Sequence, residues 1–321
     1  MGARQILPGV TAIETDTGAS PLTLYLLHDT RTLLVDSGLR STPEEAIFPA
    51  LAAAGLPEQL DMLLISHADA DHHGGNAAII ARSPSTLVLC HRLDAPRVSS
   101  KERHLHERYT GAVAADDTPY SPEIMAWLSD SIGPDTPVDL ALEGGELIRL
   151  GPGATWEALH VPGHTPGHLA LWNAELRVLI AQDALLGGMG VEPDGSPGSP
   201  PPYFDVDSYL ATLERVAALG VEQLLGAHFP PIVGADAVAA YIAESARFVA
   251  ELDQLTLAIV GEADRPLTLA AVCAAVDARL GPSSTAIQWI PPVRAHLERH
   301  TAQGRLRELQ GGGPRAWAPL T

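Results

Sequence analysis

Short apolar runs and polar turns alternate along the first part of the chain. Two such runs, at 22–27 and 32–35, flank a polar turn at 28–31, which predicts a β-hairpin. A helical pattern at 43–56 and a strand at 60–65 come next, followed by a helix at 76–82 and a strand at 86–90. Strands and helices in alternation predict an α/β domain that is built in layers.

The pattern changes further along the chain. Residues 95–140 are polar with short helical stretches, which predicts a helical insertion, and strands return at 146–182. The Gly- and Pro-rich stretch 187–202 predicts a loop, before a helix at 207–219 and a strand at 221–225. Beyond residue 258, helices at 267–280 and 292–303 and a small hairpin resemble a winged-helix module. We therefore predict a main domain at 1–258 and a winged-helix-like module at 259–321.

Imidazole and carboxylate side chains gather where the predicted strands end. The set comprises His67, Asp69, Asp71, His72, His164, Asp183 and His228. Such side chains suit Zn, Fe and Mn, and the absence of cysteine among them argues against a soft, structural metal site. The pattern predicts a hydrolytic centre with two metal ions.

Composition narrows the class of protein. The chain has 321 residues, of which 46% are hydrophobic, enough for one large core plus a small appendage. The two cysteines are far apart, and we see neither a signal peptide nor an apolar run that could span a membrane, so we expect a cytoplasmic protein without a membrane partner. A net charge of −19 disfavours nucleic-acid binding. The expected partner is a small-molecule substrate, and a homo-oligomer stays open.

The motifs around these residues resemble those of the metallo-β-lactamase superfamily. His67-x-Asp69-x-Asp71-His72, followed by two glycines, is similar to the HxHxDH signature of that family. The stretch 161–168 is similar to its PGHTPGH turn, and the surroundings of Asp183 and of the last histidine are similar to its later motifs. The resemblance covers about residues 6–240. The tail resembles, more weakly, the C-terminal helical module of the glyoxalase II and β-lactamase-like protein 2 branch.

This resemblance implies an αβ/βα four-layer sandwich with two metal ions between its sheets. By this resemblance, His67, Asp69 and His164 hold the first ion. Asp71, His72 and His228 hold the second, and Asp183 bridges the two. Asp36 and His168 are expected to support the ligands through hydrogen bonds, and three residues are candidates for the substrate pocket: His73, Tyr203 and Phe204.

One residue departs from the family pattern, because Asp69 stands where the family usually has its second histidine. With three carboxylates and a bridging hydroxide, a pair of divalent ions would be neutral, whereas histidine at that position would leave a net positive charge. The extra carboxylate makes the ions weaker Lewis acids and hardens the first site. We expect two divalent ions, with Zn first and Fe or Mn as alternatives because of Asp69.

The function that follows is hydrolysis of a small ester, thioester or lactone, in which a metal-bridging hydroxide attacks the carbonyl and Asp71 relays a proton. A non-haem di-iron redox enzyme, such as an oxygenase, is the alternative on the same fold. A ribonuclease is disfavoured by the acidic composition. A transcriptional regulator that uses residues 259–321 would need a basic recognition helix. The candidate helix at 292–303 offers only Arg294 and Arg299, opposed by Glu298, so we expect it to pack against the main domain instead.

Overall fold

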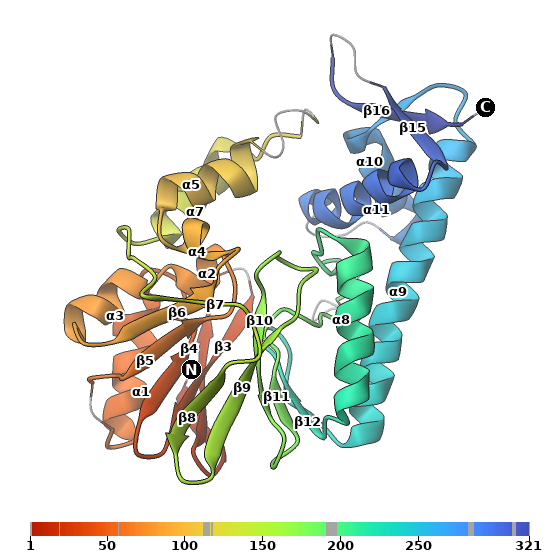
Figure 1. Ribbon diagram of the computed structural model, residues 1–321. Helices are drawn as coiled ribbons and strands as arrows, with labels where there is room; N and C mark the ends of the chain where they lie inside the picture. Colours follow the sequence, from red (N-terminus) through yellow and green to blue (C-terminus); the bar gives the residue numbers. More distant parts are fainter. Residues whose placement is uncertain are drawn as a thin grey trace. The chain divides into compact units, whose positions relative to one another are not determined.

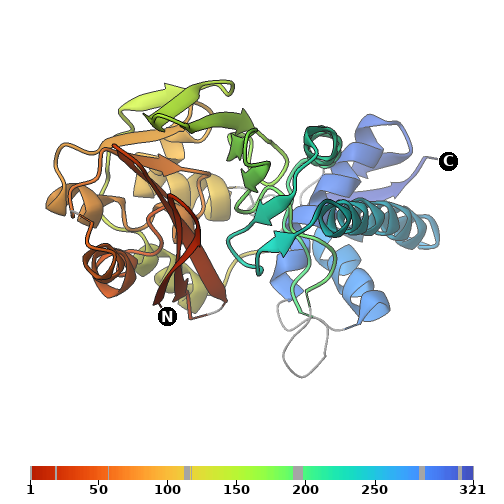
Figure 2. The same ribbon diagram turned by 90° about the horizontal axis from the view of Figure 1, so that it is seen from below.

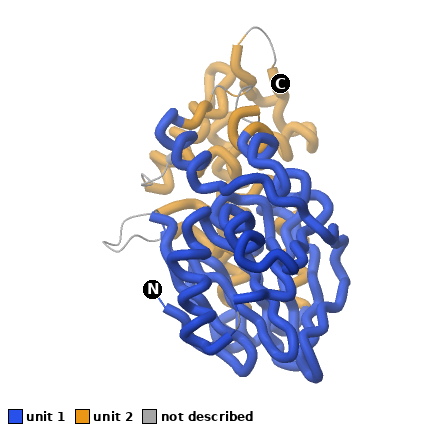
Figure 3. Tube along the Cα trace, turned by 90° about the vertical axis from the view of Figure 1, so that its left-hand side faces the viewer, with its two compact units in different colours: residues 1–105, 121–184, 219–238 blue, residues 106–120, 185–218, 239–321 orange. Residues whose placement is uncertain are grey.

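The computed structural model describes residues 2–18, 20–56, 58–111, 116, 118–190, 198–281, 286–309 and 313–320. The chain divides into two compact units (Figure 3). Unit 1 comprises residues 1–105, 121–184 and 219–238, and unit 2 comprises residues 106–120, 185–218 and 239–321. The division into domains at residue 258 stays a prediction.

The first sheet of unit 1 contains seven strands in chain order. They are β1 (Gly2–Leu7), β2 (Val10–Asp16), β3 (Pro21–His28), β4 (Thr32–Val35), β5 (Met62–Ile65), β6 (Leu87–His91) and β7 (Leu140–Leu142). Strands β1 to β4 are antiparallel, and the predicted hairpin is β3 with β4. Strands β4 to β7 are parallel, so their carboxyl ends meet at one edge of the sheet.

Helices cover one face of this sheet. Figure 1 shows α1 (Phe48–Ala53) and α3 (Asn76–Arg82) on that face. Leu24 and Leu26 of β3 pack with Phe48 and Ile79 of these helices, while Tyr25, which lies between the two leucines, belongs to the core on the other face. This alternation is the two-residue period of a strand that is buried on both faces.

The remaining helices of unit 1 are short. They are η1 (Pro43–Ile47), α2 (Ala70–His73), α4 (Ala95–Val98), α5 (Lys101–Leu105) and α7 (Pro122–Ser131). The predicted helical insertion is therefore present as α4, α5 and α7, with η2 (His106–Thr110) in unit 2. Helix α7 packs against α2 and α5.

The second sheet of unit 1 has the order β13-β12-β11-β10-β9-β8. Its strands are β8 (Leu147–Gly151), β9 (Ala154–His160), β10 (Leu169–Asn173), β11 (Val178–Ile180), β12 (Gln223–Leu225) and β13 (Ile232–Val233). Figure 2 shows its green strands beside the red and orange strands of the first sheet. Val35 and Leu64 of the first sheet share one buried core with Trp156 and Leu171 of the second. Helices, sheet and sheet thus form successive layers.

Unit 2 is mainly helical. It contains most of α8 (Val206–Leu219) and of α9 (Ala235–Gly261), followed by β14 (Leu267–Thr268), α10 (Leu269–Leu280), η3 (Ala286–Trp289), α11 (Ile290–Ala302), β15 (Leu306–Leu309) and β16 (Ala316–Pro319). The predicted tail helices correspond to α10 and α11, and the predicted hairpin to β15 and β16. Strand β14, which precedes α10 in the chain, pairs with β16 and completes a three-stranded sheet.

Candidate metal centre

The segment after β5 carries four of the predicted ligands. The chain leaves the strand at Ile65, continues through an irregular stretch to Asp69, and then enters α2. His67 and His72 are fully buried, whereas the side chains of Asp69 and Asp71 stay 16% and 23% exposed. The remaining ligands come from the β9–β10 loop and from the ends of β11 and β12, so all seven lie in unit 1.

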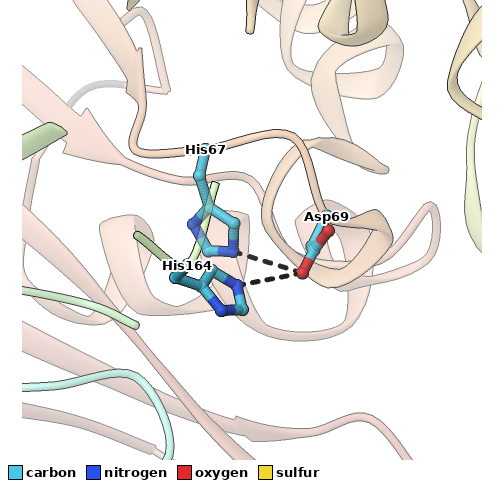
Figure 4. A group of neighbouring side chains, drawn as sticks. All are labelled: His67, Asp69 and His164. Carbon is cyan, nitrogen blue, oxygen red and sulfur yellow. Dashed lines mark hydrogen bonds and ion pairs between the residues drawn. The ribbon is translucent and has the colours of Figure 1, made fainter. Parts of the chain in front are cut away.

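His67, Asp69 and His164 form the first group (Figure 4). The Oδ2 atom of Asp69 lies 3.1 Å from Nε2 of His164 and 3.7 Å from Nε2 of His67. Both imidazoles turn the same kind of nitrogen toward one carboxylate oxygen. Three ligand atoms at this spacing could surround a cation.

Asp71, His72 and His228 form the second group. The Oδ2 atom of Asp71 lies 3.4 Å from Nε2 of His228 and 3.8 Å from Nε2 of His72. This group again joins two imidazoles and one carboxylate, so the two groups offer the same set of donor atoms.

Asp183 stands between the two groups. Its Oδ2 atom lies 3.4 Å from Nε2 of His228 and 3.5 Å from Nε2 of His72. The same oxygen lies 3.9 Å from Nε2 of His67 and 4.0 Å from Nε2 of His164. One carboxylate oxygen is thus near both groups, where a bridging ligand would lie.

Hydrogen bonds on the far side of three imidazoles fix which nitrogen faces the centre. Nδ1 of His72 donates to Asp36 at 2.8 Å, and Nδ1 of His228 donates to the carbonyl of Pro21 at 2.8 Å. The hydroxyl of Ser66 donates to Asp36, so it accepts from Nδ1 of His67 at 2.9 Å. Nε2 is therefore the nitrogen that each of the three rings turns toward the carboxylates, and its lone pair is free for a metal ion once that nitrogen carries no proton.

Buried atoms without partners supply an independent test of the fit. Nε2 of His67, Nε2 of His72 and Oδ1 of Asp183 are buried and have no hydrogen-bond partner among the described residues. Leaving such an atom unsatisfied costs about 1–3 kcal/mol, more when it is charged. Divalent cations would satisfy these atoms, so the residues fit the metal ions that the sequence predicts.

The carboxylates shift the protonation of the metal-free cluster. Burial opposes protonation of His72 and His228, but the charges of Asp71 and Asp183 outweigh it and raise the pKa of both well above the ordinary value. Burial also opposes ionisation of Asp183, yet the two histidines hold its pKa well below the usual range. By contrast, burial lowers the pKa of His67.

Asp36 joins several segments around this cluster through hydrogen bonds. Its buried carboxylate accepts from the backbone N–H and hydroxyl of Ser66, from His72, and from the amide of Gln182 at 2.6 Å. Asp36 and Gln182 both have positive φ angles, of 65° and 48°. Such backbone strain is tolerated when the surrounding bonds fix the conformation.

The other predicted residues lie in different surroundings. His168 is fully buried and stacks on His67 with ring centroids 4.5 Å apart; neither of its ring nitrogens has a hydrogen-bond partner among the described residues. His73 is buried next to His104, at 3.2 Å, and burial lowers the pKa of His73 to about 4. Tyr203 and Phe204 lie in unit 2, where the Tyr203 hydroxyl contacts His296 and Arg108 lies over the Phe204 ring.

A further group of potential ligands, in unit 2, was not predicted. Asp253 of α9 faces His296 and His300 of α11, and the spacing of the histidines on a predicted helix was the available signal. Nε2 of His300 donates to the backbone carbonyl of Asp253 at 3.1 Å, and the guanidinium of Arg299 donates to the carboxylate of Asp253 at 2.9 Å. A nitrogen engaged as a donor and an adjacent guanidinium both disfavour a cation, so this group is a hydrogen-bonded clamp.

The fold and this centre define a metallo-hydrolase class, and comparison with known proteins gives the family. Residues 17–228 match the model of the metallo-beta-lactamase superfamily, and the chain belongs to that superfamily. A metallo-beta-lactamase family protein from Thermus thermophilus superposes with a TM-score of 0.74 at 25% identity, covering 98% of this chain and 100% of that protein. The predicted fold class is confirmed.

Curated relatives agree with the predicted branch. A probable metallo-hydrolase, YflN, of Bacillus subtilis (strain 168) is 27% identical over 213 residues, 63% of this chain and 76% of the relative. A hydroxyacylglutathione hydrolase of Aeromonas hydrophila is 28% identical over 199 residues, 62% of this chain but only 56% of the relative. The acyl-coenzyme A thioesterase MBLAC2 of Homo sapiens is 29% identical over 126 residues, 33% of this chain and 42% of the relative.

The described helices also bear on the membrane prediction. Among the described residues, none of the helices is both long and apolar enough to cross a membrane.

Proposed function

We propose that this chain is a dinuclear metal-dependent hydrolase of a small ester, thioester or lactone. The observation that carries the proposal is the position of Asp183 Oδ2, within 4.0 Å of imidazole nitrogens from both three-residue groups. Membership of a superfamily with hydrolase relatives supports the same reaction type. We also propose that the protein is cytoplasmic.

Seven residues would hold the ions. His67, Asp69 and His164 would hold one, Asp71, His72 and His228 the other, and Asp183 would contact both. Bound there, two divalent ions would lower the pKa of a shared water and polarise a scissile carbonyl.

Asp71 is the residue to which we assign proton transfer. Its side chain is 23% exposed, more than that of Asp183, so it can meet both solvent and a bound substrate. Burial opposes its ionisation, but the charges of His72 and His228 outweigh burial and lower the pKa of Asp71. An ionised Asp71 can accept the proton that hydrolysis releases and return it to the leaving group.

The donor atoms bear on which metal is bound. Because Asp69 replaces a histidine, each group offers two imidazoles and one carboxylate, plus a share of Asp183. Two histidines with one carboxylate are typical of Fe(II) sites, while Zn accepts nitrogen and oxygen donors as well. We propose Zn as the ion, with Fe or Mn as the alternatives because of Asp69.

Among the three substrate classes, the relatives favour a thioester. Two of them are named for thioesters, a hydroxyacylglutathione hydrolase and an acyl-coenzyme A thioesterase. The matched region spans little more than half of the first relative and less than half of the second.

The test is a substrate panel on metal-loaded protein. Acyl-thioesters, p-nitrophenyl esters and lactones are assayed after loading with Zn²⁺, Mn²⁺ or Fe²⁺, and we expect turnover of at least one class that disappears on chelation. Asp61→Asn serves as control, because Asp61 is a carboxylate remote from the ligands that accepts bonds from Thr32. Absence of turnover with every metal would contradict the hydrolase assignment.

A di-iron redox enzyme is the second candidate, and the matching two-histidine, one-carboxylate groups favour it. Iron-loaded protein that consumes oxygen and shows an iron-linked absorbance band, without hydrolysing any member of the panel, would select this alternative.

A further inference from the structure

Asp94 is a buried carboxylate between β6 and α4 that belongs to none of the motifs above. It is fully buried and stands at the N-cap position, directly before α4, yet its side chain makes no capping hydrogen bond to that helix. Its Oδ2 atom accepts from the backbone N–H of Ala68 at 3.1 Å and from the hydroxyl of Thr165 at 2.6 Å. Its Oδ1 atom accepts from the N–H of Gly167 at 3.0 Å and from Arg97 at 2.6 Å.

These donors lie in the two segments that carry the first ligand group. Ala68 stands between His67 and Asp69, and Thr165 directly follows His164. One carboxylate therefore joins the segment after β5 to the β9–β10 loop. Both segments must keep their relative positions for the three ligands to meet.

The contacts exceed what charge neutralisation requires. Arg97 alone supplies a cation for the buried carboxylate, whereas the other three donors belong to the ligand segments. The fit is also close, because a Cβ atom at Gly167 would lie 2.7 Å from Cγ of Asp94. A buried carboxylate with four donors is strongly bound in place, so it can fix the segments that donate to it.

Asp36, by contrast, is bonded to segments of both groups, because it also accepts from Ser66, whose hydroxyl accepts from His67. It binds His72 directly and binds Gln182, the residue before Asp183. The contacts of Asp94, by comparison, are all with the first group's segments or with Arg97.

We propose that Asp94 is a positioning residue for the first metal site, holding the His67–Asp69 segment and the His164 loop together. The inference rests on the proposed function, since it concerns affinity for an ion at that group. Loss of Asp94 should weaken the first site and leave the second site unchanged.

Asp94→Asn tests this with metal binding as the readout. The amide keeps the size of the side chain but retains only one accepting oxygen, so it cannot bind both pairs of donors. In titrations with Mn²⁺ and with Zn²⁺, we expect two ions for the parent chain. For the variant, one of the two affinities should fall about 10- to 100-fold, the usual effect of changing a residue that orients a metal ligand.

Two ligand variants identify the site that is affected. His228→Ala removes a ligand of the second group. Adding Asp94→Asn to that variant should therefore lower the affinity for the ion that remains, at the first site. His164→Ala removes a ligand of the first group, so Asp94→Asn in that background should leave the remaining affinity unchanged. This pattern separates positioning of one site from a general loss of structure.

A milder variant and a matched control guard against misfolding. Thr165→Val removes only one hydrogen bond to Asp94 and leaves the ion pair between Asp94 and Arg97 in place. It should therefore lower the affinity of the first site to a smaller extent than Asp94→Asn. Asp61→Asn neutralises a carboxylate that likewise accepts from a backbone N–H and a threonine hydroxyl, and it should leave both affinities unchanged.

The outcomes separate this inference from the proposed function. Parent-like affinities in Asp94→Asn, or equal weakening of both sites, would overturn the role of Asp94 alone. A parent chain that binds neither Mn²⁺ nor Zn²⁺ would overturn the proposed function together with this inference.

Discussion

The Oδ2 atom of Asp183 lies 3.9 Å from Nε2 of His67, although the two residues follow strands of different sheets. His67 follows β5 of the first sheet, and Asp183 follows β11 of the second. The carboxyl-terminal ends of the parallel strands in both sheets thus converge on one small volume. This convergence is what a pair of bridged cations would require.

Asp183→Asn should remove the shared ligand. The neutral amide binds a cation weakly and no longer offsets the charge of either ion, so we expect at least one ion to be lost. Hydrolysis should fall by at least about 100-fold, since even residues that only orient a ligand cost 10- to 100-fold in affinity or activity. Metal content and turnover of the same preparation check the result, and a variant with parent-like content and rate would contradict it.

Asp69→His should change metal selectivity. It replaces a hard oxygen donor with imidazole and leaves the cluster more positive, which should favour Zn²⁺ over Fe²⁺ and Mn²⁺ relative to the parent chain. Competition dialysis against equimolar metals, followed by elemental analysis, gives the ratio. Identical metal content in the two proteins would count against this prediction.

Metal affinity should rise with pH. The pKa of His72 and of His228 is raised well above the ordinary value in the metal-free chain, so both carry protons near neutral pH. An ion can bind their Nε2 atoms only by displacing those protons, and binding must therefore become tighter as the pH increases toward the raised values. Zn²⁺ titration at pH 6 and pH 8, with proton release recorded, checks the sign. Equal Zn²⁺ affinity at the two pH values, without proton release, would contradict this prediction.

Asp253→Asn should destabilise the chain at neutral pH and less so in acid. Burial opposes ionisation of Asp253, but the bond from His296 and the nearby positive charges outweigh burial and lower the pKa of Asp253 from 3.8 to about 2. A carboxyl whose pKa is lowered by folding contributes stability above its unfolded pKa, and this contribution is lost as the pH falls through the folded value. We expect the variant to lose about 1–3 kcal/mol at pH 7, the cost of leaving its buried partners unsatisfied.

Urea unfolding of the parent chain and of Asp253→Asn at pH 7 and pH 3 provides the measurement. The difference in free energy of unfolding should shrink at the lower pH. An equal difference at both values would show that the lost contact is independent of charge.

The sequence predicted the elements whose signals are local. The hairpin of β3 and β4, helix α3 and the tail helices follow from hydrophobic period and turn residues. The seven candidate ligands are recognisable because they stand at strand ends in family motifs, and the structure brings them together. Whether they bind metal stays a prediction.

Other features depend on contacts that no local pattern encodes. Helix α9, which is 27 residues long, was not predicted, and the predicted boundary at 258 falls near its end. In the sequence, Asp94 cannot be told from an ordinary turn aspartate, because the loops that donate hydrogen bonds to it come close only after folding. Tyr203 was predicted to line a substrate pocket. Its ring is buried beside Tyr209, and its hydroxyl contacts His296, through long-range packing in unit 2.

Locating bound metal tests the central claim most directly. The chain is equilibrated with Zn²⁺ or Mn²⁺, its metal content is measured, and the ions are located by anomalous diffraction. The account predicts two ions per chain, one at each ligand group, with Asp183 contacting both. A single ion, no ion, or ions bound only at the Asp253 clamp would contradict it.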